Sequence, residues 1–140
     1  MLRPVSNEHP DDETFEGLLI VRPEGRLFFV NEQSVAERIE ALVKQHRPRV
    51  LAIDMSRVPD IEYSALQAMM EREKRVTASG VEVWLAGLNP GTLEVVRRAG
   101  FDERLGRERM LFNARQAIER YQARRAGEPS MDPSNGAKLT

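Results

Sequence analysis

Residues 50–70 read VLAIDMSRVPDIEYSALQAMM, and this stretch predicts a strand, a loop and a helix in succession. It opens with an apolar run that polar, turn-forming residues bound, which is typical of a buried strand. Pro59 then forbids helical continuation and restrains Val58 to an extended backbone, so residues 54–63 are expected to form a loop. A helix with apolar side chains near the 3.6-residue period is expected to start at Ser64. The stretch therefore places a hydroxyl group and free backbone N–H groups at a helix N-terminus, where a phosphate or another anion is favoured.

The residues before this stretch predict a hairpin and a helix. Residues 18–21 and 27–30 are short apolar runs on either side of a turn that contains Gly25, a pattern typical of two antiparallel strands. Asn31 is a good N-cap for the amphipathic helix that is expected next, and Pro48 ends that helix.

After the central helix, which Gly80 is expected to end, residues 81–86 predict another core strand. A helix is expected from the Asn89-Pro90 pair onward, followed by a short edge strand at residues 110–112 and a last helix capped by Asn113. Alternating strands and helices predict an α/β fold with a mixed, mostly parallel β-sheet, to which the N-terminal β-hairpin adds an antiparallel piece. We expect a flexible leader at residues 1–16, one domain at residues 17–125 and a disordered tail at residues 126–140.

Composition narrows the class of function. A net charge of −1 argues against a nucleic-acid partner. The chain has no cysteine and only two histidines far apart in sequence, so we expect no metal site and no cofactor. No apolar run approaches the roughly 20 residues of a membrane helix, and the N-terminus lacks a signal peptide, so the chain as given is expected to be soluble and cytoplasmic.

Residues 54–66, DMSRVPDIEYSAL, look like the signature of STAS domains, the module shared by sulfate transporters and anti-sigma-factor antagonists. Residues 83–90, VWLAGLNP, residues 99–101 and the PEGR turn of the predicted hairpin resemble the transporter branch, and the similarity covers roughly residues 17–122. The resemblance implies a mixed sheet with amphipathic helices packed on one face. In SulP anion permeases this domain follows the membrane helices, at the C-terminal end on the cytoplasmic side of the inner membrane.

Ser64 is the candidate phospho-acceptor that the resemblance suggests. Anti-sigma-factor antagonists carry a DSSG or DSTG motif at this helix start, and a partner kinase phosphorylates its second hydroxyl residue. The corresponding residues here are Glu62, Tyr63, Ser64 and Ala65, so a bulky tyrosine replaces a small residue and alanine replaces glycine. This departure favours the transporter branch, and a role for Ser64 in the first turn of the helix is the simpler interpretation.

The leading hypothesis is a non-enzymatic regulatory domain of a SulP-type transporter for sulfate, bicarbonate or a related anion. Its contact surface for the membrane domain, a regulatory protein or an anion is expected at eight consecutive residues: Pro59, Asp60, Ile61, Glu62, Tyr63, Ser64, Ala65 and Leu66. The family has been linked to nucleotide ligands as well, but this chain lacks a GxxxxGK phosphate loop. The alternative is a free-standing anti-sigma-factor antagonist that phosphorylation of Ser64 switches.

Other polar and aromatic residues have simpler explanations than catalysis, and no catalytic constellation is visible. Asp54 and Ser56 are expected to hydrogen-bond the backbone of their own turn. Trp84 is expected in the core or on a face of the sheet. The arginines at residues 120–125 are expected to form a solvated helix end, which is a simpler role than contact with anionic lipid.

Overall fold

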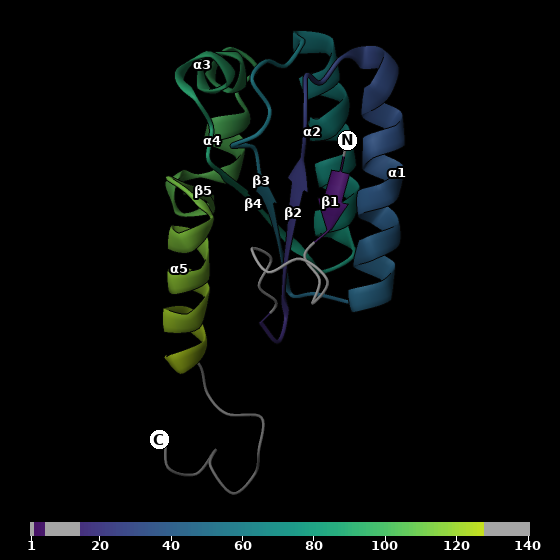
Figure 1. Ribbon diagram of the computed structural model, residues 1–140. Coiled ribbons are helices and arrows are strands. Elements are labelled where there is room, and N and C mark those ends of the chain that lie inside the picture. Colours follow the sequence, from purple (N-terminus) through teal and green to yellow (C-terminus); the bar gives the residue numbers. More distant parts are fainter. Residues whose placement is uncertain (1, 5–14, 128–140) are drawn as a thin grey trace, which may run out of the picture.

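The computed structural model describes residues 2–4 and 15–127 (Figure 1). The elements are, in chain order, β1 (Leu2–Pro4), β2 (Leu18–Pro23), α1 (Phe29–His46), β3 (Val50–Asp54), α2 (Tyr63–Ala78), β4 (Glu82–Ala86), α3 (Pro90–Arg98), α4 (Phe101–Leu105), the 3₁₀ turn η1 (Arg107–Arg109), β5 (Met110–Leu111) and α5 (Ala114–Ala126). Most of the predicted leader and tail lie outside the described residues.

The described strands form one sheet in the order β1-β2-β3-β4-β5. β1 runs antiparallel to β2, and every other neighbouring pair is parallel. The prediction of an α/β fold with a mixed, mostly parallel sheet is therefore confirmed. β3 is buried along its whole length, as expected for a strand with neighbours on both sides and cover on both faces.

The predicted hairpin of residues 18–21 with residues 27–30 is not confirmed. β2 pairs with β1 on one side and β3 on the other, while Leu27 makes a single parallel bridge to Ile61. The chain enters α1 at Phe29, because two side chains accept the first backbone N–H groups of this helix. Asn31 Oδ1 accepts from the Phe28 N–H and Glu62 Oε1 accepts from the Phe29 N–H, each at 2.8 Å. Asn31 was expected before the helix but lies in its first turn.

Alternate residues along the strands divide the core between two faces of the sheet. Leu19, Leu51 and Val83 face α1 and α2, and α3 and α4 add Val96 and Phe101 to the same cluster. These helices join successive parallel strands across the sheet in one direction, so crossovers of the same hand carry them to one face.

The opposite face is covered by α5, so the expectation that the helices pack on one face holds only for α1 to α4 (Figure 1). Trp84 and Leu18 on this face pack with Ala117 and Tyr121 of α5. α5 follows the last described strand and joins no strand pair, so it is free to bury these apolar side chains. Trp84 is 1% exposed, which confirms its expected place in the core.

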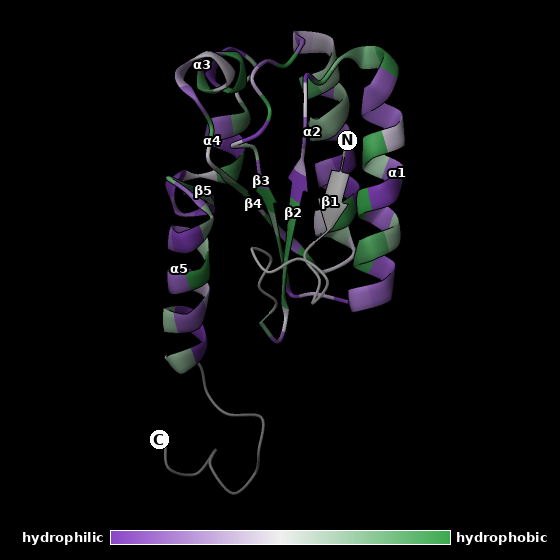
Figure 2. Cartoon of the chain, viewed as in Figure 1, coloured by the Kyte–Doolittle hydropathy of each residue, from purple (hydrophilic) through white to green (hydrophobic). Residues whose placement is uncertain are grey.

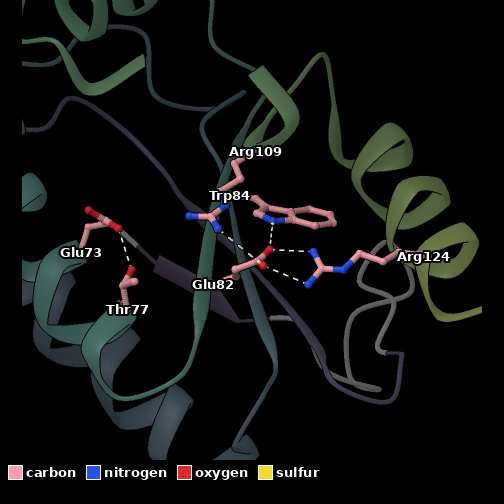
Figure 3. A network of polar contacts seen from close by, with 6 residues as sticks. All are labelled: Glu73, Thr77, Glu82, Trp84, Arg109 and Arg124. Carbon is pink, nitrogen blue, oxygen red and sulfur yellow. Dashed lines mark hydrogen bonds and ion pairs between the residues drawn. The ribbon is translucent and has the colours of Figure 1, made fainter. Parts of the chain in front are cut away.

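A polar network fastens α5 to β4 (Figure 3). Arg124 donates to both carboxylate oxygens of Glu82, at 2.7 and 2.9 Å, and its guanidinium lies 5.9 Å from the centre of the Trp84 ring. The Trp84 indole N–H donates to the same carboxylate at 2.8 Å. The hydrogen bonds from Arg124 are the main reason why the pKa of Glu82 lies below its ordinary value.

Tyr121 fastens α5 to the residues that precede β2, and Gly17 leaves room for its hydroxyl group. Tyr121 Oη donates to the Glu16 carbonyl at 2.6 Å, and a Cβ at Gly17 would overlap the same Tyr121 hydroxyl group. The φ angle of Gly17 is 86°, in the left-handed region that side chains disfavour.

Replacement of Gly17 by alanine is expected to destabilise the fold more than the same change at Gly25. Gly25 has a similar φ of 92° but open space around its missing Cβ, so Gly25→Ala should cost only the backbone strain of about 1–2 kcal/mol. Gly17→Ala should cost about 1–3 kcal/mol more, because Tyr121 must move. Urea denaturation of the two variants measures the difference, and equal losses would contradict the proposed close packing of Gly17 on α5.

Candidate functional site

The connection between β3 and α2 begins at a buried carboxylate. Asp54, the last residue of β3, accepts a hydrogen bond from the Ser56 backbone N–H at 3.0 Å through Oδ1. Its Oδ2 accepts from Arg22 Nε at 2.8 Å. The expected Asx turn is therefore present, and Arg22 of β2 neutralises the charge that the turn buries.

Two apolar side chains hold the loop onto the core, and the residues between them face solvent. Val58 and Ile61 are buried, whereas Pro59 and Asp60 are exposed. Residues 25–27 run alongside the loop: the Leu27 N–H donates to the Asp60 carbonyl at 3.1 Å, and the Glu62 N–H donates to the Leu27 carbonyl at 2.9 Å. The loop therefore has a fixed backbone although its outer side chains are exposed.

Asn89 fixes the loop from the other side. Its Oδ1 accepts from the Thr92 N–H at 2.8 Å, which caps α3. Its Nδ2 donates to the Pro59 carbonyl at 3.2 Å, with a longer contact of 3.4 Å to the Val58 carbonyl. One side chain therefore couples the start of α3 to the β3–α2 loop.

The structure separates the eight predicted contact residues into two sets. The exposed set is Pro59, Asp60, Glu62, Tyr63 and Ser64, and the buried set is Ile61, Ala65 and Leu66. The buried set belongs to the core that α2 forms with the sheet, so only the exposed set can meet a partner.

Ser64 is the second residue of α2, one position later than the helix start that the sequence predicts for it. Glu62 occupies the N-cap position of α2 but makes no side-chain cap there, because its carboxylate accepts the Phe29 N–H of α1. The side chains around Ser64 carry both signs of charge. Asp60 lies 3.9 Å from Arg26 in an exposed ion pair, and the Arg98 guanidinium lies 5.7 Å from the centre of the Tyr63 ring.

Exposed apolar residues that the sequence pattern does not predict lie next to the loop. Phe29 is 64% exposed and Val30 is 90% exposed, and Phe28 and Tyr63 are also exposed. The hydrogen bond from Phe29 to Glu62 holds the start of α1 beside the start of α2. In Figure 2 the upper end of α1, where this helix begins, has the colour of hydrophobic residues. We call these four residues, Phe28, Phe29, Val30 and Tyr63, the apolar corner.

The described part of the chain offers no cluster of histidine, aspartate and glutamate side chains that could hold a metal ion. Within the same residues, none of the helices combines the length and the apolar character that crossing a membrane requires.

Replacement of Asn89 by alanine is expected to loosen the β3–α2 loop. The loss of the α3 cap should cost about 1–2 kcal/mol, and the loss of the bond to Pro59 should raise hydrogen exchange at residues 55–62. Asn113→Ala is the matched control, because Asn113 caps α5 in the same way, with Oδ1 2.8 Å from the Gln116 nitrogen. It should cost similar stability without raising exchange in the loop, whereas equal exchange in both variants would contradict the coupling.

The sequence of this chain is similar to one domain family and to known proteins. The family model described as "STAS domain" matches residues 9–120 of the chain. Sulfate transporter 1.3 of Arabidopsis thaliana is 26% identical over 123 residues, which are 81% of this chain and 19% of that protein. The chain thus spans about a fifth of the length of the curated relative.

Solved structures share the fold. The crystal structure of a sulfate transporter family protein from Wolinella succinogenes superposes with a TM-score of 0.69 at 24% identity, covering 84% of this chain and 96% of that one. The unphosphorylated anti-sigma factor antagonist SpoIIAA superposes with a TM-score of 0.66 at 15% identity, covering 88% and 97% of the two chains. The chain is thus related to sulfate transporters and shares its fold with an anti-sigma factor antagonist, and the match of the family model over most of its length shows that it belongs to the STAS domain family.

Proposed function

We propose that this STAS domain is a non-enzymatic regulatory domain of a SulP-type transporter for sulfate or a related anion. Its partner is the membrane domain of the same polypeptide or complex, and it acts on the cytoplasmic side of the inner membrane. The relationship to sulfate transporters supports the class of system, because the matched relatives are about five times longer than the chain and leave room for a membrane part.

The observation that carries the docking role is the apolar corner beside the β3–α2 loop. Exposed phenylalanine and valine side chains lose hydration when they are covered, so they are favourable anchors for a partner surface. Phe29 and Val30 stand at the start of α1, where the hydrogen bond to Glu62 fixes them next to the loop. The polar side chains of Asp60 and Ser64 would form the rim of the same surface.

A β3–α2 loop with a fixed backbone allows binding of a partner to influence the transporter. The loop is held by Asp54, Val58, Ile61 and Asn89, so it has one backbone arrangement to present. A partner that binds it in only one transport state stabilises that state by the difference in binding free energy between the two states.

The docking role predicts that polar substitutions in the apolar corner weaken binding without weakening the fold. Phe29→Ser combined with Val30→Ser should reduce the affinity of this domain for the membrane part of its transporter about tenfold or more, since two anchors are lost. Because both side chains are already exposed in the free domain, its thermal midpoint should change little.

The matched control is Phe112→Ser. Phe112 is 83% exposed but follows β5, away from the α1 and α2 starts. It should leave affinity unchanged. Equal loss of affinity in the control, or no loss in the double variant, would contradict docking through the apolar corner. Anion flux through the reconstituted transporter carrying the same substitutions reports the regulatory effect.

A second candidate function is a free-standing antagonist of an anti-sigma factor, switched by phosphorylation of Ser64. The exposed hydroxyl near the α2 N-terminus favours it, because a phosphate there gains from the partial positive charge of the helix end. Incubation with a cognate kinase and ATP, read by intact mass, should add one phosphate that Ser64→Ala abolishes. Absence of phosphorylation, together with some ten or more hydrophobic spans encoded upstream in the same gene, would eliminate this candidate.

A further inference from the structure

A second concave region lies on the α5 face of the sheet, apart from the β3–α2 loop. It is a cavity of about 430 Å³ between β4, η1 and α5, lined by Glu82, Trp84, Glu108, Arg109, Arg120 and Arg124. Glu82 and Trp84 share one face of β4 because they are two residues apart on a strand. Arg120 and Arg124 share one face of α5 because they are four residues apart on a helix.

The carboxylate of Glu82 already accepts hydrogen bonds from neighbouring side chains. It accepts two hydrogen bonds from Arg124 and one from the Trp84 indole N–H (Figure 3). These bonds and the positive charge of Arg109 lower the pKa of Glu82, so its carboxylate stays ionised at neutral pH. Glu82 and Arg124 therefore form a structural pair that fastens α5 to the sheet.

Arg109 and Arg120 keep donors that the described chain does not use. Arg109 Nη2 lies 3.6 Å from Glu82 Oε1, too far for a hydrogen bond, and within residues 15–127 no hydrogen bond from this guanidinium is found. Arg120 donates one N–H to the Glu108 carbonyl, at 2.6 Å. A guanidinium carries five N–H donors in a planar fork that matches the oxygens of a phosphate or sulfate group.

The surroundings of the cavity are positively charged. The whole chain has a net charge of −1, but the residues that line the cavity carry a net positive charge. Around the cavity itself three guanidinium groups face two carboxylates. Such a local excess raises the concentration of anions at the site.

We propose that this cavity binds a small molecule that carries a phosphate or sulfate group, with Arg109 and Arg120 donating to its oxygens. Arg124 and Glu82 form the fixed wall that positions the two donors. The volume lies in the range of small-molecule sites and leaves room for an organic part beside the oxyanion. The inference is independent of docking through the apolar corner, since the two regions share no residue.

The single tryptophan gives a direct measurement, because Trp84 lines the cavity and no other tryptophan contributes. Titration of the full chain with inorganic phosphate or sulfate, at constant ionic strength set with sodium chloride, should change Trp84 emission in a saturable way. Because inorganic oxyanions lack the organic part, we expect a dissociation constant of about 1 mM. Constant ionic strength removes the general screening effect of added salt.

Arg109→Gln should weaken this binding about tenfold or more, since it removes the charge and most of the donors of one guanidinium. Arg115→Gln is the matched control: Arg115 is exposed on α5 and does not line the cavity, so it should bind as the parent chain does. Arg120→Gln serves as the second test variant if Arg109→Gln fails to fold by circular dichroism.

A vesicle-binding experiment distinguishes a lipid headgroup from a soluble ligand as the source of the anionic group. Flotation with phosphatidylglycerol in phosphatidylcholine vesicles tests a lipid headgroup, and inorganic phosphate tests a soluble ligand. Saturable binding of phosphate or sulfate that Arg109→Gln weakens and Arg115→Gln keeps would support the proposal. A response that is not saturable, equal affinity in all variants, or binding to vesicles without binding of phosphate or sulfate would overturn it.

Discussion

The conformation of the β3–α2 loop depends on the buried carboxylate of Asp54. It ends β3 and accepts hydrogen bonds from Arg22 at the end of β2 and from the Ser56 backbone just beyond it. The next residue, Met55, donates its backbone N–H to the Ala86 carbonyl at the end of β4. A buried charge without partners would cost several kcal/mol, so the need to compensate this carboxylate ties the end of β2 to the start of the β3–α2 loop, while the backbone bond of Met55 joins the same loop to the end of β4. With Asp54 fixed, Val58 and Ile61 reach the core and the residues between them are left at the surface.

The two-residue period of the strands explains why the molecule has two separate candidate sites. Side chains of one parity face α1 and α2, whose N-termini meet at the apolar corner. Side chains of the other parity, including Glu82 and Trp84, face α5 and its arginines. Because the sheet lies between them, a ligand bound in the arginine-lined cavity would not contact a partner bound at the apolar corner.

The sequence was sufficient where one period extends over many residues. The burial of β3, the span of α2 and the caps at Asn89 and Asn113 follow from local pattern and capping chemistry. Residues 27–30 were misassigned because a short apolar run fits a strand and a helix start equally well. The choice is made by Glu62, which accepts the Phe29 N–H from 33 residues away, and no local pattern contains that information.

One candidate site could be predicted from the sequence and the other could not. The signature around Ser64 could be read from the sequence, whereas the exposure of Phe29 and Val30 depended on the correct assignment of α1. The arginine-lined cavity could not be foreseen, because its residues come from β4, η1 and α5 and meet only after α5 crosses to the opposite face. The arginines near residue 120 looked like a solvated helix end, and Arg124 is in fact bound to Glu82 and close to the ring of Trp84.

Charge alone does not favour docking at the apolar corner over phosphorylation of Ser64, but the bulk of the side chain beside Ser64 favours docking. The α2 N-terminus favours a phosphate on Ser64, while Asp60 and Glu62 oppose it; both acids are partly compensated, by Arg26 and by the Phe29 N–H. The Tyr63 ring, with Arg98 against it, adds bulk next to the hydroxyl that a kinase would have to enclose. Tyr63 is one of the exposed residues of the apolar corner, so the residue that would hinder phosphorylation of Ser64 is also one that would add apolar surface to the proposed docking contact.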